Sequence, residues 1–153
     1  MTYIVALLVG VMAGLRTMTA PAAVAWAAQL GWLHLDQTWL AFLGYRWTPW
    51  VFTVLAIVEL VTDQLPSTPS RKVPLQLGAR LVSGALCGTA IGLSGGAAAI
   101  GAVVGIVGAL AGTYGGAAVR GRLATTFGSD RPAALMEDAV AVVGAVLLVA
   151  AVR

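Results

Sequence analysis

Charged residues are scarce in this sequence. Only 10% of its 153 residues are Asp, Glu, Lys or Arg, whereas soluble domains usually carry roughly a quarter. Hydrophobic residues make up 59% of the chain, and uncharged stretches reach about 17 to 25 residues, the length that crosses the hydrocarbon core of a bilayer. The shortage of charge argues against a soluble globule. It predicts an all-α, multi-pass membrane protein that forms a single domain over residues 1–153, with membrane lipids as its partners.

Cysteine and histidine each occur once, as Cys87 and His34. A single cysteine excludes an intramolecular disulfide and a thiolate metal cluster, and a single histidine excludes a multi-histidine site within one chain. The sequence also lacks the Gly-x-Ser-x-Gly, His-Glu-x-x-His and phosphate-loop motifs. Its nine basic residues are scattered, which argues against a nucleic-acid groove. We therefore expect no metal, no cofactor, no nucleic-acid partner and no enzymatic activity.

The apolar runs predict a compact bundle of about five transmembrane helices. Prolines and small polar turns separate the runs, and an aromatic connection between Trp32 and Trp50 is typical of a membrane interface. Within that connection, 39–45 is compatible with a short helix at the surface. The five expected spans are 2–33, 49–65, 75–93, 97–119 and 132–152.

Basic residues predict the orientation of the bundle. They lie between the second and third spans and between the fourth and fifth, and the positive-inside rule assigns both loops to the cytoplasm. With five crossings the N-terminus is then cytoplasmic as well, and the aromatic connection faces outside. The residues that support this orientation are Arg71, Lys72, Arg120, Arg122 and Arg131.

The first apolar run is interrupted. Pro21 removes a backbone donor and clashes with the preceding turn, and the hydroxyls of Thr17 and Thr19 can bond to the carbonyl groups that it frees. We therefore expect a broken first helix, either kinked within one crossing or re-entrant. If the segment turns back, the N-terminus moves outside and the orientation of the later spans is unchanged.

Glycines recur at helical spacing in the third and fourth spans. Small residues let membrane helices approach closely, which strengthens the van der Waals contact between them. We expect these glycines to pack the two helices as a hairpin; packing against a second copy, in a homo-oligomer, is the alternative. The first set is Gly84, Gly88, Gly92 and Gly96, and a nearly equivalent set follows at Gly101, Gly105, Gly108, Gly112 and Gly116.

Ionisable residues within the spans fall towards the predicted cytoplasmic face. Glu59 and Asp63 are four residues apart, so on a helix they share a face and repel each other. In a medium of low dielectric constant, either protonation of one carboxyl or a neighbouring cation must relieve that repulsion. We predict that one polar site brings together Arg16, Glu59, Asp63, Arg80, Glu137 and Asp138.

Two functions fit such a site. Charges in membrane helices are costly and commonly mark a binding site or a pathway, which suggests a small transporter or channel-like protein for an ion, a proton or an anionic lipid headgroup. The alternative is a structural or partner-binding membrane protein whose buried charges only form ion pairs. An intramembrane enzyme that uses Glu59 and Asp63 is a third reading, which we do not favour.

The stretch from Glu59 to Pro66 carries a family resemblance. It reads Glu-Leu-Val-Thr-Asp-Gln-Leu-Pro and is followed by Arg80 and Gly84. It resembles a family of small bacterial membrane proteins of unknown function, whose motif is an intramembrane Glu-x-x-x-Asp-[Lys/Gln]-[Ile/Leu]-Pro. The likeness covers most of the chain and includes an early Gly-x-Arg motif that ends here at Arg16.

The chain departs from that family at two places. It has Gln64 where lysine is frequent, and 67–71 where many members carry another acidic residue, so a role that needs this carboxylate does not transfer. The resemblance implies a bacterial plasma (inner) membrane location. It also supports Glu59, Asp63 and Arg80 as one unit, but it brings no activity with it.

Overall fold

The computed structural model describes residues 1–65 and 72–153, and within them every regular element is a helix. Three helices, α4, α5 and α6, are long and apolar enough to cross a membrane, and α1 and α3 are shorter apolar helices. These findings confirm the all-α fold and agree with a membrane protein. The elements are α1 (Thr2–Leu15), α2 (Thr19–Gln29), η1 (Ala41–Gly44), α3 (Thr48–Thr62), α4 (Pro74–Ser94), α5 (Ala98–Phe127) and α6 (Asp130–Ala150).

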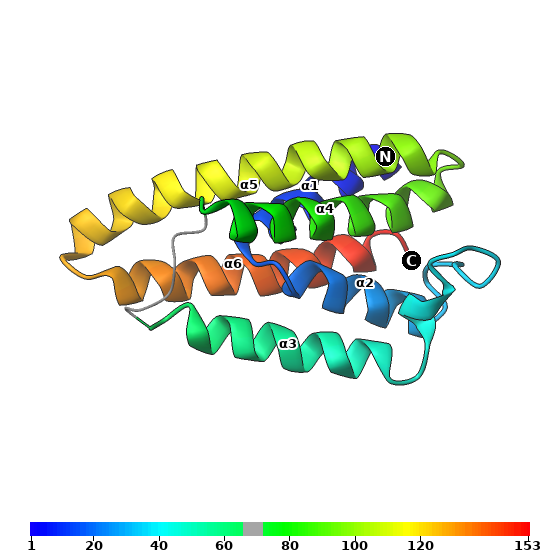
Figure 1. Cartoon of the computed structure of the whole chain (residues 1–153), viewed down its shortest axis with the longest axis horizontal. Helices are drawn as coiled ribbons and strands as arrows, with labels where there is room; N and C mark the ends of the chain where they lie inside the picture. The colour runs from blue at the N-terminus through cyan, green and yellow to red at the C-terminus, as the bar shows by residue number, and fades with distance from the viewer. Residues whose placement is uncertain (66–71) are drawn as a thin grey trace.

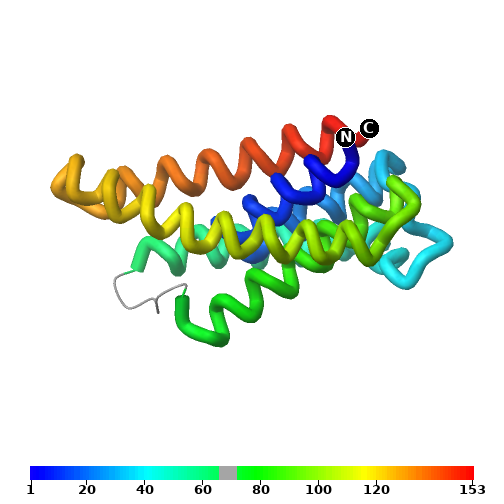
Figure 2. The backbone as a smooth tube through the Cα atoms, turned by 90° about the horizontal axis from the view of Figure 1, so that it is seen from above, coloured from blue at the N-terminus to red at the C-terminus, as the bar shows by residue number. Residues whose placement is uncertain are grey.

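The helices lie side by side along the long axis of the molecule (Figures 1 and 2). Both termini, the connection from α2 to α3 and the turn from α4 to α5 lie at one end, which we call the aromatic end. The end of α5 and the start of α6 lie at the other, which we call the charged end. The predicted proline stop at Pro66 and Pro69, and the basic residue Arg71, fall outside the described residues.

The first apolar run forms two helices. α1 ends at Leu15, Arg16 is extended with φ of −140° and ψ of 121°, and α2 begins at Thr19. From the aromatic end, α1 runs towards the middle of the molecule and α2 runs back (Figures 1 and 2). Pro21 is the third residue of α2, a position whose backbone N–H has no helical partner. The chain therefore turns before the proline, so Pro21 itself does not interrupt a helix.

Glycines bring α5 into backbone contact with α4. A Cβ atom added at Gly88 would lie 2.2 Å from the carbonyl oxygen of Gly101, and one added at Gly105 would lie 2.1 Å from that of Gly84. Real Cβ atoms essentially never come this close, so only glycine fits at these positions. Part of each glycine set therefore meets the other, at Gly84, Gly88, Gly92, Gly101 and Gly105, but not at Gly96, Gly108 or Gly112.

A second glycine contact joins α5 to α1. A Cβ added at Gly108 would lie 2.1 Å from the Leu7 carbonyl oxygen, and one at Gly14 would lie 2.3 Å from that of Ala109. The sequence interpretation did not include this contact. Gly96 also differs from its expected role: it lies in the turn after α4 with φ of +77°, and a Cβ there would meet nothing within 4 Å. Its function is to allow the turn, since this backbone conformation favours glycine.

Helix α3 lies at the side of the bundle and packs mainly on α2 and η1. The indole Nε1 of Trp26 donates to Thr53 Oγ1 at 3.0 Å, and the rings of Trp26 and Trp50 meet edge to face with centroids 5.1 Å apart. Only Pro49 and Ala56 of this helix are buried. Most of its apolar surface is exposed, which suits a helix that faces lipid.

Candidate functional site

Carbonyl groups at the end of α1 are bound by a buried arginine. Arg80 Nη1 donates to the carbonyl oxygens of Gly14 and Leu15 at 2.7 and 2.8 Å, and Thr113 Oγ1 donates to Gly14 at 3.3 Å. The last carbonyl groups of a helix have no intrahelical partner and carry partial negative charge. A cation from α4 therefore compensates the end of α1.

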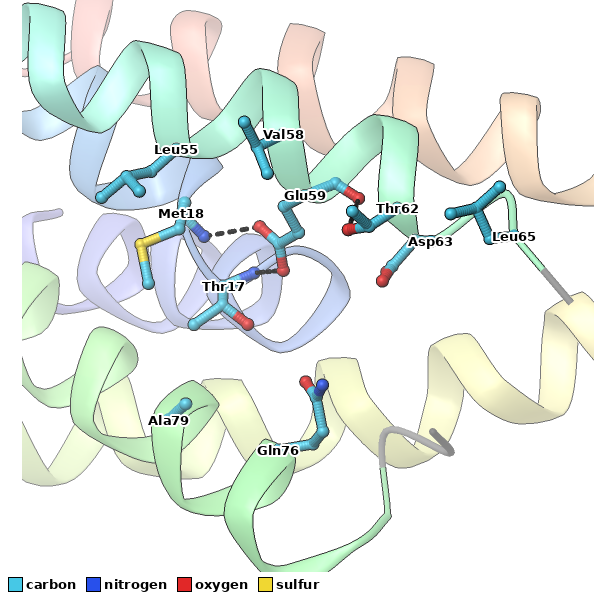
Figure 3. A pocket seen from close by; sticks show the side chains of 10 residues that line it. All are labelled: Thr17, Met18, Leu55, Val58, Glu59, Thr62, Asp63, Leu65, Gln76 and Ala79. Carbon is cyan, nitrogen blue, oxygen red and sulfur yellow. Dashed lines mark hydrogen bonds between the residues drawn. The ribbon is translucent and has the colours of Figure 1, made fainter. Parts of the chain in front are cut away.

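A carboxylate occupies the opposite position before α2. The backbone N–H groups of Thr17 and Met18 donate to Glu59 Oε1 and Oε2 at 2.6 and 2.8 Å (Figure 3). Ser83 Oγ donates to the Thr17 carbonyl oxygen at 2.6 Å. Partial positive charge at a helix N-terminus favours an anion there. The interruption between α1 and α2 thus has a carboxylate from α3 on one side and a guanidinium from α4 on the other.

The threonine hydroxyls were expected to bond to the carbonyl groups freed at the interruption. Arg80 binds the carbonyl groups freed at the end of α1, and the buried Thr19 hydroxyl has no hydrogen-bond partner within the described residues. Thr17 contributes its backbone N–H and carbonyl group. The expectation for Thr19 is therefore wrong, because a longer cationic side chain from another helix reaches these acceptors.

Arg16 is the centre of a second group of contacts. Its side chain is fully buried, its Nε donates to Asp138 Oδ1 at 2.6 Å, and its Nη1 forms an ion pair with Asp63 Oδ2. Glu137 Oε2 lies 3.9 Å from Arg16 Nη2. Gln64 Nε2 donates to Asp138 Oδ2 at 2.9 Å. All six residues predicted for the polar site therefore lie in one connected region, around Arg16 and Arg80.

The region extends to the surface through residues that the sequence interpretation did not include. Arg120 Nη1 lies 3.4 Å from Glu137 Oε2, and Arg120 bonds to Asp130 at 2.9 and 2.5 Å. The carboxylate of Asp130 is 60% exposed. In the sequence, Arg120 supports only the predicted orientation, and no spacing predicts that it contacts Glu137.

The charges of this region are joined in ion pairs. Buried charges in proteins are normally paired. Within the described residues, three arginines contact five carboxylates in this region. The arginines are Arg16, Arg80 and Arg120, and the carboxylates are Glu59, Asp63, Asp130, Glu137 and Asp138.

An open pocket of about 510 Å³ lies against the interruption (Figure 3). Among the described residues that line it, Glu59 and Asp63 are the charged ones; Gln76 faces them from α4, and the other lining side chains are mostly apolar. Glu59 and Asp63 keep 14% and 15% of their side-chain surface exposed, whereas Arg16 is fully buried behind them. The carboxylates of Glu59 and Asp63 are therefore accessible from the pocket, whereas Arg16 is not.

Within residues 1–65 and 72–153, no three His, Cys, Asp or Glu side chains are grouped to hold a metal ion. Comparisons of the chain with protein-family models, curated proteins and solved structures found no match. The candidate site must therefore be interpreted from its own geometry.

Proposed function

We propose that the chain is a small transporter or channel-like protein of the bacterial plasma membrane, with its site at the interruption between α1 and α2. The observation that supports this proposal most directly is the pocket beside the interruption, which is lined by Glu59 and Asp63. Interrupted helices in membrane proteins commonly bind ions or substrates at their exposed ends. Backbone groups outside a regular helix are tolerated at membrane depth where they line a cavity.

The proposed topology has one re-entrant pair and four crossing helices. In this arrangement α1 and α2 enter and leave at the aromatic end, and α3, α4, α5 and α6 cross. The positive-inside rule assigns the charged end, with Lys72, Arg122 and Arg131, to the cytoplasm. The N-terminus lies at the other end in Figure 1. This supports the re-entrant alternative, in which the N-terminus is outside, over a cytoplasmic N-terminus with five crossings.

The short length of α3 is compatible with a crossing helix whose end lies beside the interruption between α1 and α2. Its 15 residues extend about 22 Å at 1.5 Å per residue, less than the roughly 30 Å of a bilayer core. A helix shorter than the bilayer core has one end inside it, and Asp63 follows directly after the end of α3. The carboxylates can then reach the interruption from a position close to the cytoplasmic surface.

The alternative is a structural or partner-binding protein in which the charges only form ion pairs. The complete burial of Arg16 among three carboxylates favours this reading. Removing one partner of a buried pair leaves an uncompensated charge, so such clusters strongly affect folding. The exposed edges of Glu59 and Asp63 favour the transport hypothesis, because a closed structural cluster has no need of a pocket.

The resemblance to small bacterial membrane proteins of unknown function stays a proposal. It rests on Glu59, Asp63 and Arg80, which are close to one another around the interruption, and it carries no substrate with it. A homo-oligomer also stays a proposal. Contacts with α1 and between α4 and α5 within one chain occupy most of these glycines, so an oligomer would need a different surface, such as the outer side of α3.

A flux assay with a matched control tests transport. The protein is reconstituted into liposomes that contain a pH-sensitive dye, and ion or proton flux is driven by a pH gradient or a K⁺ diffusion potential. Asp63→Asn and Glu59→Gln each remove a carboxylate from the site, and Asp36→Asn removes an exposed carboxylate from the aromatic end. Transport predicts flux in the wild type and in Asp36→Asn, and its loss in the two site variants.

Aqueous access distinguishes the two functions independently of flux. In a Cys87→Ser background, Glu59→Cys supplies the only thiol, and a membrane-impermeant maleimide reports whether water reaches the site. Detergent-unfolded protein is the control. Fast labelling in folded protein supports transport. Absence of labelling, together with absence of flux and a lower melting temperature for Glu59→Gln, would support the structural alternative.

A further inference from the structure

The pocket at the interruption has the size and composition of a ligand site. Its volume of about 510 Å³ lies within the roughly 300 to 1,000 Å³ that is usual for small-molecule sites. Leu55 and Val58 of α3 and Ala79 of α4 form an apolar part. Glu59 and Asp63 form the charged part. A mostly apolar lining with a few polar groups on one side is suited to an amphipathic molecule.

The charge of the pocket selects the sign of the ligand. One oxygen of Asp63, Oδ2, pairs with Arg16, and Oδ1 has no hydrogen-bond partner within the described residues. In Figure 3 this carboxylate points from α3 into the space between α3 and α4. Among the described residues that line the pocket, the charged ones are acidic and none is basic. An anion would meet like charges first, whereas a cation would meet charges of opposite sign.

The position of the pocket favours entry from the lipid side. α3 packs mainly on α2 and η1 and has little contact with α4, so the pocket opens between α3 and α4. The outer surface of α3 beside it is apolar and exposed, including Val54 at 58%. A molecule with an apolar body can move along such a surface, whereas a hydrated metal ion has no favourable contact there.

We propose that this pocket binds a monovalent organic cation with an apolar body, such as a lipophilic quaternary ammonium or phosphonium compound. The carboxylates of Glu59 and Asp63 face its charge, and Leu55, Val58 and Ala79 pack against its apolar groups. This inference rests on the proposed function and deepens it, because it names the substrate class. It replaces the anionic lipid headgroup among the candidate ligands.

Two probes of equal shape and opposite charge test this proposal. Tetraphenylphosphonium and tetraphenylborate have the same four phenyl groups, so their size and shape are nearly matched and their charges are opposite. Binding to purified full-length protein in detergent is measured by equilibrium dialysis, with detergent alone subtracted. Saturable binding of the phosphonium, and borate binding weaker by about tenfold or more, is expected, a difference of about 1.4 kcal/mol. Equal binding of both probes, or no saturable phosphonium binding, overturns the proposal.

Matched variants locate the site. Ala79→Trp fills the pocket and leaves every charge in place, and Val82→Trp adds the same side chain to α4 on its exposed surface. Phosphonium affinity should fall by about tenfold or more in the first and change less than about twofold in the second. If Ala79→Trp does not fold, as judged by size-exclusion chromatography, Asp63→Asn decides, since it should lower phosphonium affinity and reduce the preference over borate. Equal losses for Ala79→Trp and Val82→Trp would contradict this location.

Binding and flux can fail separately. If the phosphonium does not bind but proton or ion flux depends on Glu59, the pocket does not take an organic cation and the proposed transport function stands. If the phosphonium binds with the expected selectivity and no flux of any ion is found, the binding site stands and the transport function fails. The two readouts therefore assign each failure to one proposal.

Discussion

Replacing Gly88 by alanine should separate α4 from α5. The added Cβ would lie 2.2 Å from the Gly101 carbonyl oxygen and 2.9 Å from Gly105 Cα. Ordinary contact begins near 3.4 Å, so the helices must move apart locally by about 1.2 Å, and a gap of about 0.5–1 Å already forfeits a quarter to a half of a dispersion contact. Overpacking of this kind costs about 1–3 kcal/mol.

The matched control is Gly78→Ala on the same helix. A Cβ there would meet nothing within 4 Å, so only the helix propensity changes, and alanine is favoured by about 0.5–1 kcal/mol. The propensity gain is common to both variants and cancels, so we expect Gly88→Ala to be less stable than Gly78→Ala by the overpacking cost of about 1–3 kcal/mol. The measurement is unfolding in mild detergent with increasing dodecyl sulfate, followed by tryptophan fluorescence.

The sign of the difference is the decisive result. If Gly88→Ala is as stable as Gly78→Ala, α4 and α5 are not in backbone contact at this glycine and the packing argument fails. A concentration-dependent loss at Gly88 would instead indicate that the glycine surface packs against a second chain. Gly101→Ala should reproduce the effect from α5, since a Cβ there would lie 2.2 Å from the Gly88 carbonyl oxygen.

Three further predictions concern polar contacts. Arg16→Gln leaves buried carboxylates without their cation and should destabilise the fold by about 3–5 kcal/mol, whereas Arg153→Gln, at the exposed C-terminus, should have little effect; both are compared by melting temperature. Thr53→Val removes the acceptor of the Trp26 indole and should cost about 1–3 kcal/mol, with a shift in tryptophan emission as a second readout. Arg120→Gln breaks the exposed pair with Asp130 and also the contact with the largely buried Glu137, so it should cost about 1–3 kcal/mol, less than Arg16→Gln, with the Asp130 part reduced in high salt. A loss as large as that of Arg16→Gln would contradict this ranking.

Periodicity and proline positions predicted most of the helices. α4 was expected at 75–93 and lies at Pro74–Ser94, because a proline suited to a first turn and a glycine turn mark its ends. The span expected at 97–119 continues to Phe127, since Arg120 and Arg122 do not stop a helix that extends beyond the membrane. Charge predicts where a span leaves the bilayer, but it does not predict where the backbone stops being helical.

The boundary between α1 and α2 lies in the stretch where the sequence has polar residues and a proline, but the contacts there differ from the expected ones. Arg16 to Pro21 carried a signal because arginine, threonine and proline are unusual in an apolar run. Its stabilising contacts come from Glu59, Arg80 and Ser83, which are distant in sequence. A single sequence does not show which distant side chain will bond to backbone groups that lack a helical partner. The nearby threonine hydroxyls were therefore expected to bond to the carbonyl groups, and that expectation was wrong.

The glycine contacts and the polar site depend on each other. Arg80 stands one helical turn before Gly84, whose added Cβ would lie 2.6 Å from the Gly105 carbonyl oxygen, and Gly14 packs on α5 directly beside the carbonyl group that Arg80 binds. Close backbone approach therefore sets the distance from α4 to the end of α1, so that one arginine reaches two carbonyl groups. A bundle held apart by larger side chains would leave those groups unpaired in an apolar medium, where each costs several kcal/mol. The glycines thus allow the close helix packing through which Arg80 stabilises the interrupted helix beside the carboxylates.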